Sequence, residues 1–102
     1  MAGSRPWAPG DRTGGPLDDI LRSVRARFPD VTVSRLVGTW PADDDNVFWI
    51  RRNRVEVQID TADGGVPPFT VESDEPGSRL DTNDAEAATE RINRLLDGLG
   101  EA

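Results

Sequence analysis

Cysteine, histidine, lysine and tyrosine are all missing from this chain of 102 residues. Without cysteine the chain has neither disulfide bonds nor thiolate metal ligands, and without histidine it lacks the commonest metal ligand and the commonest general base. Activation of a serine or threonine nucleophile needs a neighbouring base, and carboxylates are the only groups left to act as one. We therefore expect a protein that is not an enzyme and that holds no metal ion and no cofactor.

Positive charge is scarce as well. Twelve basic residues, all of them arginine, stand against 19 acidic residues, which gives a formal net charge of −7 and an isoelectric point of about 4.4. Nucleic acids and anionic membranes attract proteins through positive charge, so neither is an expected partner. A basic protein is a more natural partner for so acidic a chain.

Long apolar runs are absent too. No stretch approaches the roughly 18 consecutive apolar residues of a membrane-spanning helix. Residues 1–15 also lack the apolar core of a secretion signal. We expect a cytoplasmic protein.

The length of the chain corresponds to a single domain with a modest core. Residues 1–15 are rich in glycine, proline and arginine, and Trp7 is their only aromatic side chain, which predicts a flexible N-terminal tail. Residues 16–102 are expected to form one α+β domain. Trp7 either stays free in the tail or folds back onto this domain.

Two amphipathic patterns predict helices at the two ends of the domain. The first helix is expected to begin at Pro16 and to end before Pro29, with an apolar stripe formed by Leu17, Ile20, Leu21, Val24 and Phe28. The second follows a cap made by Asn83 and Glu86. Its apolar stripe consists of Ala85, Ala88, Ile92, Leu95, Leu96 and Leu99.

The clearest strand pattern lies in residues 46–60. Val55, Val57 and Ile59 alternate with polar residues, which is the period of a strand with one buried and one solvated face. A turn centred on Arg52-Asn53 pairs Ile50 with Val55 and Phe48 with Val57, and directly paired residues share a face. A three-residue turn would reverse this assignment. The expected core side of the hairpin is formed by Phe48, Ile50, Val55, Val57 and Ile59.

Residues 31–37 and 69–72 have strand-like patterns, and Leu80 adds at most a brief extended piece. The resulting order is α-β-β-β-β-α with short linkers. It predicts an α+β fold with an antiparallel sheet of three or four strands and both helices packed on one face. The other face of the sheet would then be open to solvent.

This open face is the expected binding surface for a protein partner. Pairing in the hairpin assigns six residues to it: Val47, Trp49, Arg51, Arg54, Glu56 and Gln58. Tryptophan and arginine are enriched among the residues that dominate binding energies. Two alternatives stay open: an arginine stacks on the indole and pairs with Glu56 as a self-contained cluster, or Trp7 or Trp40 covers the surface.

The run Asp43-Asp44-Asp45 suggests calcium, because hard cations prefer carboxylate oxygens. Counting from Asp43, however, Phe48 occupies the glycine position of an EF-hand loop and Arg54 the position of the bidentate glutamate. A solvated acidic loop is the better interpretation.

Two other charged groups suggest different functions. Glu56 and Glu72 lie on neighbouring predicted strands, where a carboxylate pair could act as acid and base, although exposed carboxylates on a sheet more typically serve solubility. A basic patch for a phosphate or an acidic peptide would form if the first helix ended near the hairpin turn. That patch would contain Arg22, Arg25, Arg51, Arg52 and Arg54.

We expect a non-catalytic protein-binding module that uses the open sheet face. In size, acidity and helix-covered sheet the chain is similar to bacterial immunity proteins and small secretion chaperones, which implies a protein partner and no chemistry, and carries over no site residues. The alternatives are a homodimer joined through the same face or an edge strand, and the binding of a small anion by the arginine patch.

Overall fold

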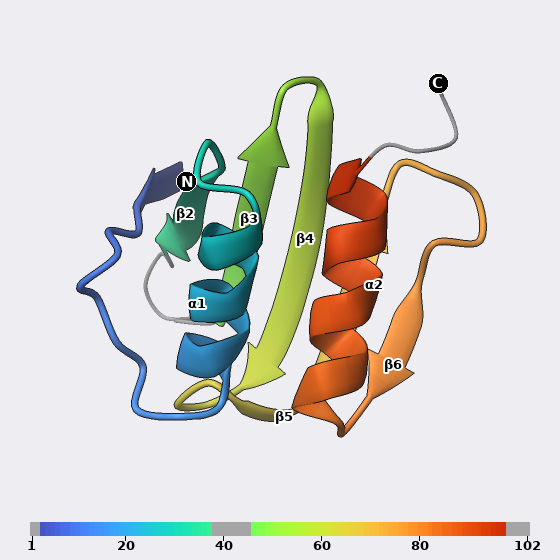
Figure 1. Cartoon of the computed structure of the whole chain (residues 1–102). Coiled ribbons are helices and arrows are strands. Elements are labelled where there is room, and N and C mark those ends of the chain that lie inside the picture. The colour runs from blue at the N-terminus through green and yellow to red at the C-terminus, as the bar shows by residue number, and fades with distance from the viewer. Residues whose placement is uncertain (1–2, 38–45, 98–102) are drawn as a thin grey trace.

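The computed structural model describes residues 3–37 and 46–97. In chain order the elements are β1 (Gly3–Pro6), α1 (Leu17–Arg27), β2 (Thr32–Val37), β3 (Val47–Arg52), β4 (Val55–Ala62), β5 (Val66–Ser73), β6 (Leu80–Thr82) and α2 (Ala85–Asp97). The strands form one antiparallel sheet in the order β1-β2-β3-β4-β5-β6 (Figure 1). The predicted α+β class and antiparallel sheet are confirmed, but the sheet has six strands instead of three or four. The short strands β1 and β6 account for the difference.

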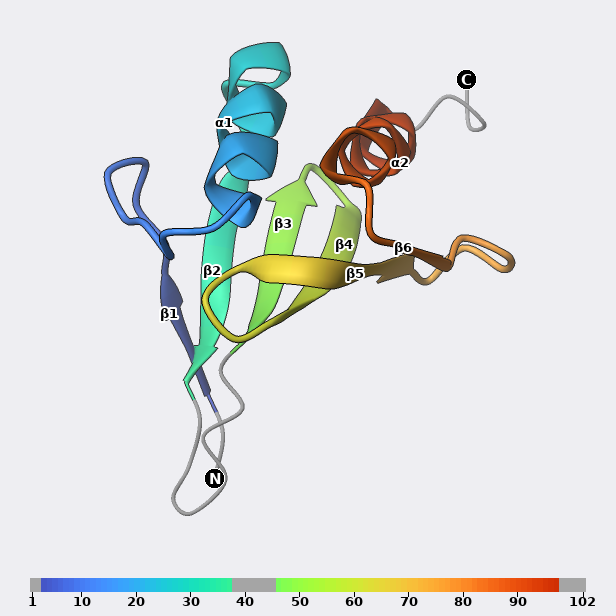
Figure 2. The ribbon, with the colours of Figure 1, turned by 90° about the horizontal axis from the view of Figure 1, so that it is seen from below.

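Both helices lie on the same side of the sheet, as the view along the sheet shows (Figure 2). Helix α2 contacts β4, β5 and β6, and α1 contacts α2. Helix α1 runs beside β2 and β3 in both views. The two helices thus cover different parts of one face, and the described chain leaves the opposite face without a helix. No helix in these ranges combines the length and the apolar character needed to cross a membrane.

One hydrophobic core fills the space between the helices and the sheet. Helix α1 contributes Leu17, Ile20, Leu21 and Val24, and α2 contributes Ala88, Ile92, Leu95 and Leu96. The strands contribute Val33, Phe48, Ile50, Val57, Ile59, Phe69 and Val71. The buried residues therefore recur about every 3.6 positions in the helices and every second position in the strands, as in other two-layer folds.

The central hairpin turns one position later than the sequence predicts. Its two turn residues are Asn53 and Arg54, so that Ile50 pairs with Val57 and Phe48 pairs with Ile59. Asn53 has a φ of 56°, and asparagine tolerates this left-handed conformation better than most residues. Moving the centre of the turn by one position shifts the register by two residues. The side chains within the two paired strands therefore stay on their predicted faces.

The N-terminal segment differs from the predicted flexible tail. Gly3–Pro6 forms β1 and pairs with β2, and Trp7 is only 5% exposed. The Trp7 ring lies edge-on to the Phe48 ring with centroids 5.3 Å apart, and its backbone N–H donates to the Val33 carbonyl at 2.8 Å. The free energy gained by burying the Trp7 side chain outweighs the conformational entropy that is lost when this glycine- and proline-rich segment becomes ordered.

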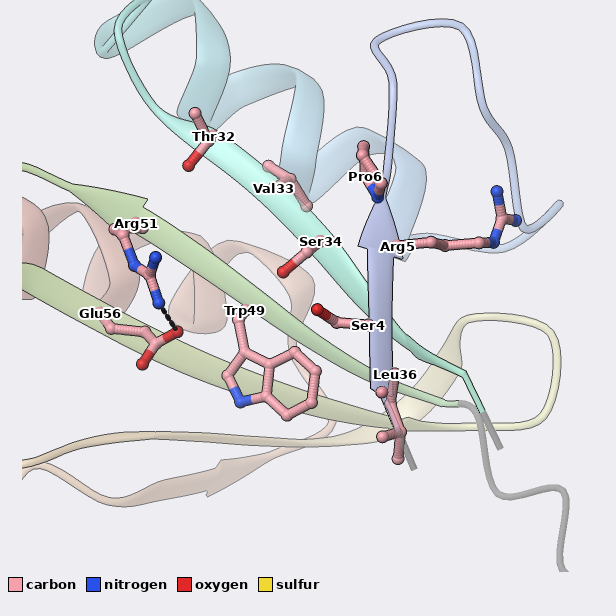
Figure 3. Close-up of a pocket in the computed structure, with 11 residues that line it drawn as sticks. Ser4, Arg5, Pro6, Thr32, Val33, Ser34, Leu36, Trp49, Arg51 and Glu56 are labelled. Carbon is pink, nitrogen blue, oxygen red and sulfur yellow. Dashed lines mark hydrogen bonds and ion pairs between the residues drawn. The ribbon is translucent and has the colours of Figure 1, made fainter. Parts of the chain in front are cut away.

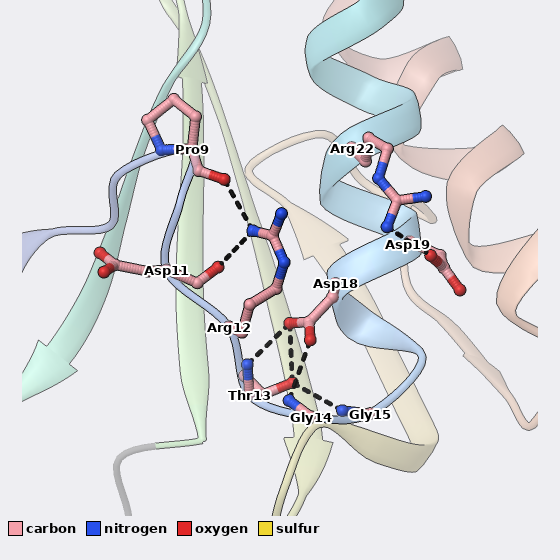
Figure 4. Close-up of polar contacts among 9 residues, drawn as sticks. All are labelled: Pro9, Asp11, Arg12, Thr13, Gly14, Gly15, Asp18, Asp19 and Arg22. Carbon is pink, nitrogen blue, oxygen red and sulfur yellow. Dashed lines mark hydrogen bonds and ion pairs between the residues drawn. The ribbon is translucent and has the colours of Figure 1, made fainter.

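The loop that follows Trp7 is fastened to α1 by one carboxylate (Figure 4). Asp18 accepts hydrogen bonds from the backbone N–H groups of Thr13 and Gly14 at 2.8 and 2.9 Å, and from the Thr13 hydroxyl at 2.9 Å. Burial acts to raise the pKa of Asp18, but these hydrogen bonds together outweigh it and hold the pKa below its ordinary value. The loop is therefore tied to the first turn of the helix.

Candidate functional site

The uncovered face of the sheet brings together five of the six predicted binding residues. Val47, Trp49 and Arg51 alternate along β3 with the fully buried Phe48 and Ile50. On β4, Glu56 and Gln58 alternate with Val57 and Ile59, which are also fully buried. Arg54, the sixth residue, lies in the hairpin turn and not on the face of the sheet. Its placement on the face was wrong because the predicted turn lay one position too early, and its role in binding stays a prediction.

Trp49 is half-buried at the centre of this face. It pairs with Ser34 on β2 and with Gln58 on β4. Its indole Nε1–H donates to Gln58 Oε1 at 3.2 Å, and Gln58 Nε2 donates in turn to Asp60 Oδ1 at 2.9 Å. This chain of hydrogen bonds fixes the orientation of the ring while leaving part of it in contact with solvent.

The self-contained cluster predicted as an alternative forms only in part. Arg51 pairs with Glu56 at 2.9 Å, as that alternative expected. Over the described ranges, however, no guanidinium group stacks on the Trp49 ring. The arginines instead stack on Trp7, where Arg5 and Arg35 lie 5.3 and 4.9 Å from the ring centroid.

Trp7 does not cover Trp49. Trp7 belongs to the core on the opposite side of the sheet. Trp40 lies outside the described residues, as do Asp43, Asp44 and Asp45.

A groove of about 850 Å³ runs across the open face beside Trp49 (Figure 3). Strands β1 to β4 all contribute to it. Its surface combines the indole and Leu36 with hydroxyl groups and one ion pair. The side chains that give it this character are Ser4, Ser34, Leu36, Trp49, Arg51 and Glu56.

The contribution of β1 and β2 to this groove was missed from the sequence. The alternation of buried Val33 with Ser34 and Leu36 places the last two on the open face, so the β2 residues could have been inferred. Ser4 could not, because β1 was taken for a tail. Its position depends on pairing with Leu36, 32 residues further along the chain.

Negative charge is concentrated on the open face. Strands β4 to β6 present four carboxylates there, from Glu56, Asp60, Glu72 and Asp81. They are opposed by Arg51 on β3 and by Arg79 in the loop before β6, which leaves a net charge of −2. The two helices together carry five carboxylates and five arginines, a net charge of zero. Charge within the two helices is thus balanced, whereas the open face favours positively charged groups.

Hydrogen bonds stabilise the charged form of Asp81 at one edge of this face. Its carboxylate accepts hydrogen bonds from the Thr70 hydroxyl at 2.7 Å and from Arg79 Nε at 3.3 Å. The hydrogen bond from Thr70, followed by that from Arg79, lowers the pKa of Asp81. The β6 edge of the face therefore remains anionic at neutral pH.

The arginines predicted to form a basic patch have separate partners. Arg22 pairs with Asp19 at 3.0 Å, Arg25 donates to the Trp7 carbonyl, and Arg51 pairs with Glu56 on the open face. Burial lowers the pKa of Arg25, although the nearby Asp11 opposes this effect.

Arg52 lies on the other side of the sheet from Arg51. Its side chain is on the inner face, where Nη1 donates to the Leu96 carbonyl at 3.0 Å and Nε donates to Asp30 at 3.2 Å. The guanidinium carbon lies 4.5 Å from the centroid of the Phe28 ring. Arg52 therefore joins the hairpin to both helical segments, and it is not available on the same surface as Arg51.

No group of three or more acidic side chains arranged to hold a metal ion occurs in residues 3–37 and 46–97. The two carboxylates considered as an acid and base pair have arginine partners, Arg51 for Glu56 at 2.9 Å and Arg79 for Glu72 at 3.9 Å. Both line a small hollow beside Trp49. The face thus combines charged side chains with a half-buried indole.

No protein-family model, no curated protein and no solved structure matches this chain.

Proposed function

We propose that the protein is a non-catalytic binding module that docks a partner protein on the open face of its sheet, centred on Trp49. The observation that carries the proposal is the groove of about 850 Å³ on a face that the helices leave uncovered, with a half-buried indole in its wall. Large apolar groups with a polar handle are the residues that most often dominate protein interfaces.

The hydrogen bond from Trp49 to Gln58 supports this proposal. A ring that is already oriented loses little conformational freedom when a partner packs on it, and this lowers the cost of association. The rim is polar, with Ser4, Ser34 and the Arg51–Glu56 pair around the indole. An apolar centre with a polar rim is the usual arrangement of a protein interface.

A protein partner fits this surface better than a small molecule does. Small ligands are usually enclosed on most sides by a concave, mainly apolar pocket. The groove here lies along the surface of four strands, and hydroxyl and charged groups occupy much of its border (Figure 3). An extended segment or a flat surface patch of another protein can contact its whole length.

The proposal is tested by affinity capture from host lysate with the tagged protein and two variants. Trp49→Ala removes the indole at the centre of the groove, and Arg22→Ala is the control because Arg22 lies on α1, on the other side of the sheet. We expect a partner that is captured by the unchanged protein and by Arg22→Ala and is lost from Trp49→Ala, with all three giving the same far-UV circular dichroism spectrum. Retention of the same partner by Trp49→Ala would show that the docking surface lies elsewhere.

The same face could join two copies of the chain, which is the homodimer considered from the sequence. Sedimentation velocity of the free protein at several concentrations separates the two cases. A self-association that Trp49→Ala abolishes would identify a second copy as the partner. A monomer at all concentrations leaves the face available for a different protein.

A further inference from the structure

A second, smaller hollow of about 110 Å³ adjoins the groove on the open face. Its lining residues are Trp49, Glu56, Gln58, Glu72, Ser73 and Asp74. Trp49 and Glu56 also line the larger groove, so the two hollows meet at these side chains. The register confirms the direction: Trp49 pairs with Gln58, and Gln58 pairs with Glu72. A segment that crosses the strands over Trp49 therefore passes from the groove to the small hollow.

The small hollow is anionic and contains no basic lining residue. The arginines that pair with Glu56 and Glu72 are not among its lining residues, and the side chains of both pairs are between 43% and 64% exposed. Ion pairs with this exposure contribute little to stability and exchange readily. Asp74 is exposed and has no hydrogen bond or ion pair within the described part of the chain. Three carboxylates thus surround a space of the size of one side-chain head group.

The indole beside these carboxylates also lacks a cation. Arginine stacks on Trp7, Phe28 and Phe48 on the inner side of the sheet, but over residues 3–37 and 46–97 none stacks on Trp49. A guanidinium group is attracted both to an indole face and to carboxylates, and its apolar stem packs well on an aromatic ring. The open face therefore has the two components of an arginine-binding site without an arginine of its own.

We propose that the docked partner presents an arginine side chain to this hollow. Its stem packs on Trp49, and its guanidinium group pairs with Glu72 and Asp74, while apolar residues of the same segment lie in the larger groove beside Leu36. Arginine fits better than lysine because its planar guanidinium group stacks on aromatic rings and binds carboxylates through two parallel hydrogen bonds. This inference rests on the proposed docking function and specifies the chemistry of the partner.

The test uses random peptides of 12 residues displayed on phage and selected on the unchanged protein, with counter-selection on Trp49→Ala. We expect the selected peptides to contain an arginine next to an apolar residue. A synthetic copy of the best peptide is compared with one in which citrulline, the uncharged analogue of nearly the same shape, replaces that arginine. Citrulline should weaken binding about tenfold, the scale of a partly desolvated cation–π contact together with an ion pair.

Two double variants with the same change in net charge locate the effect. Glu72→Gln with Asp74→Asn removes the two carboxylates that pair with the guanidinium group, and the difference between the arginine and citrulline peptides should then fall to about threefold or less, the share of the cation–π contact with Trp49. Glu86→Gln with Glu90→Gln removes two exposed carboxylates from α2, and the tenfold difference should remain. Thermal unfolding of both double variants confirms that they are folded.

The outcomes separate this inference from the docking proposal. Peptides that depend on Trp49 but lack arginine, or that bind equally well with citrulline, would refute the arginine site and leave docking on the face intact. An equal effect of the two double variants would show a general charge effect and would also refute the site. If no selected peptide depends on Trp49, both proposals are wrong.

Discussion

Replacement of Trp7 by alanine tests whether the N-terminal segment is part of the core. Trp7 is 5% exposed, and its ring packs edge-on against Phe48, which is fully buried. A tryptophan side chain buries roughly 200 Å², and at about 25 cal/mol per Å² its removal costs about 5 kcal/mol. Residual structure in the unfolded chain lowers this value. We expect Trp7→Ala to reduce the free energy of unfolding by about 4 kcal/mol, within the range for large core truncations.

Urea unfolding followed by far-UV circular dichroism measures this loss without depending on tryptophan fluorescence. A reduction of about 4 kcal/mol is a large share of the 5–15 kcal/mol typical of small domains, so the midpoint should move markedly. Val37→Ala is the control, because Val37 on the neighbouring strand is 43% exposed and should change stability by less than about 0.5 kcal/mol. A loss below about 1 kcal/mol for Trp7→Ala would refute the placement of this residue in the core.

Two further predictions concern polar contacts that fasten the fold. Asp18→Ala removes the acceptor for the Thr13 and Gly14 N–H groups and should cost about 1–2 kcal/mol at pH 7. The pKa of Asp18 is lowered in the folded protein. The difference in the free energy of unfolding between the unchanged protein and this variant should therefore be complete at neutral pH and disappear as the pH falls below about 4. Urea unfolding at several pH values measures this difference. Arg52→Met keeps the apolar stem but loses the hydrogen bond to the Leu96 carbonyl. It should lower the thermal midpoint by several degrees, corresponding to about 1 kcal/mol, and an unchanged midpoint would contradict a fastening role.

The helices and the central hairpin could be predicted from the sequence because their apolar residues recur at the spacing of a helix or a strand. The error in the turn did not affect the faces of the strands, since it shifted the register by two positions. Trp49 was therefore assigned correctly to the side opposite Phe48 and Ile50. Arg54 was misassigned because a residue next to a turn has no face until the turn is located.

The two edge strands were harder to predict from the sequence because each is placed by contacts that its local sequence does not show. Nothing local in Gly3–Pro6 distinguishes a strand from a tail, and its position is set by the burial of Trp7. The predicted arginine patch was wrong for a different, local reason. Continuing the alternation of Phe48 and Ile50 by one step would have placed Arg52 inside, away from Arg51.

The absence of an enzyme activity and of a cofactor, and the cytoplasmic location, stay predictions.

The central claim is that the open sheet face binds a partner through Trp49. Its most direct test is isothermal titration calorimetry of the captured partner against the unchanged protein, Trp49→Ala and the Arg22→Ala control. Truncation of a residue at the centre of an interface typically costs 2 kcal/mol or more of binding free energy. We therefore predict that Trp49→Ala raises the dissociation constant about 30-fold or more. Arg22→Ala should bind within twofold of the unchanged protein. Binding by Trp49→Ala within twofold of the unchanged protein would contradict the claim.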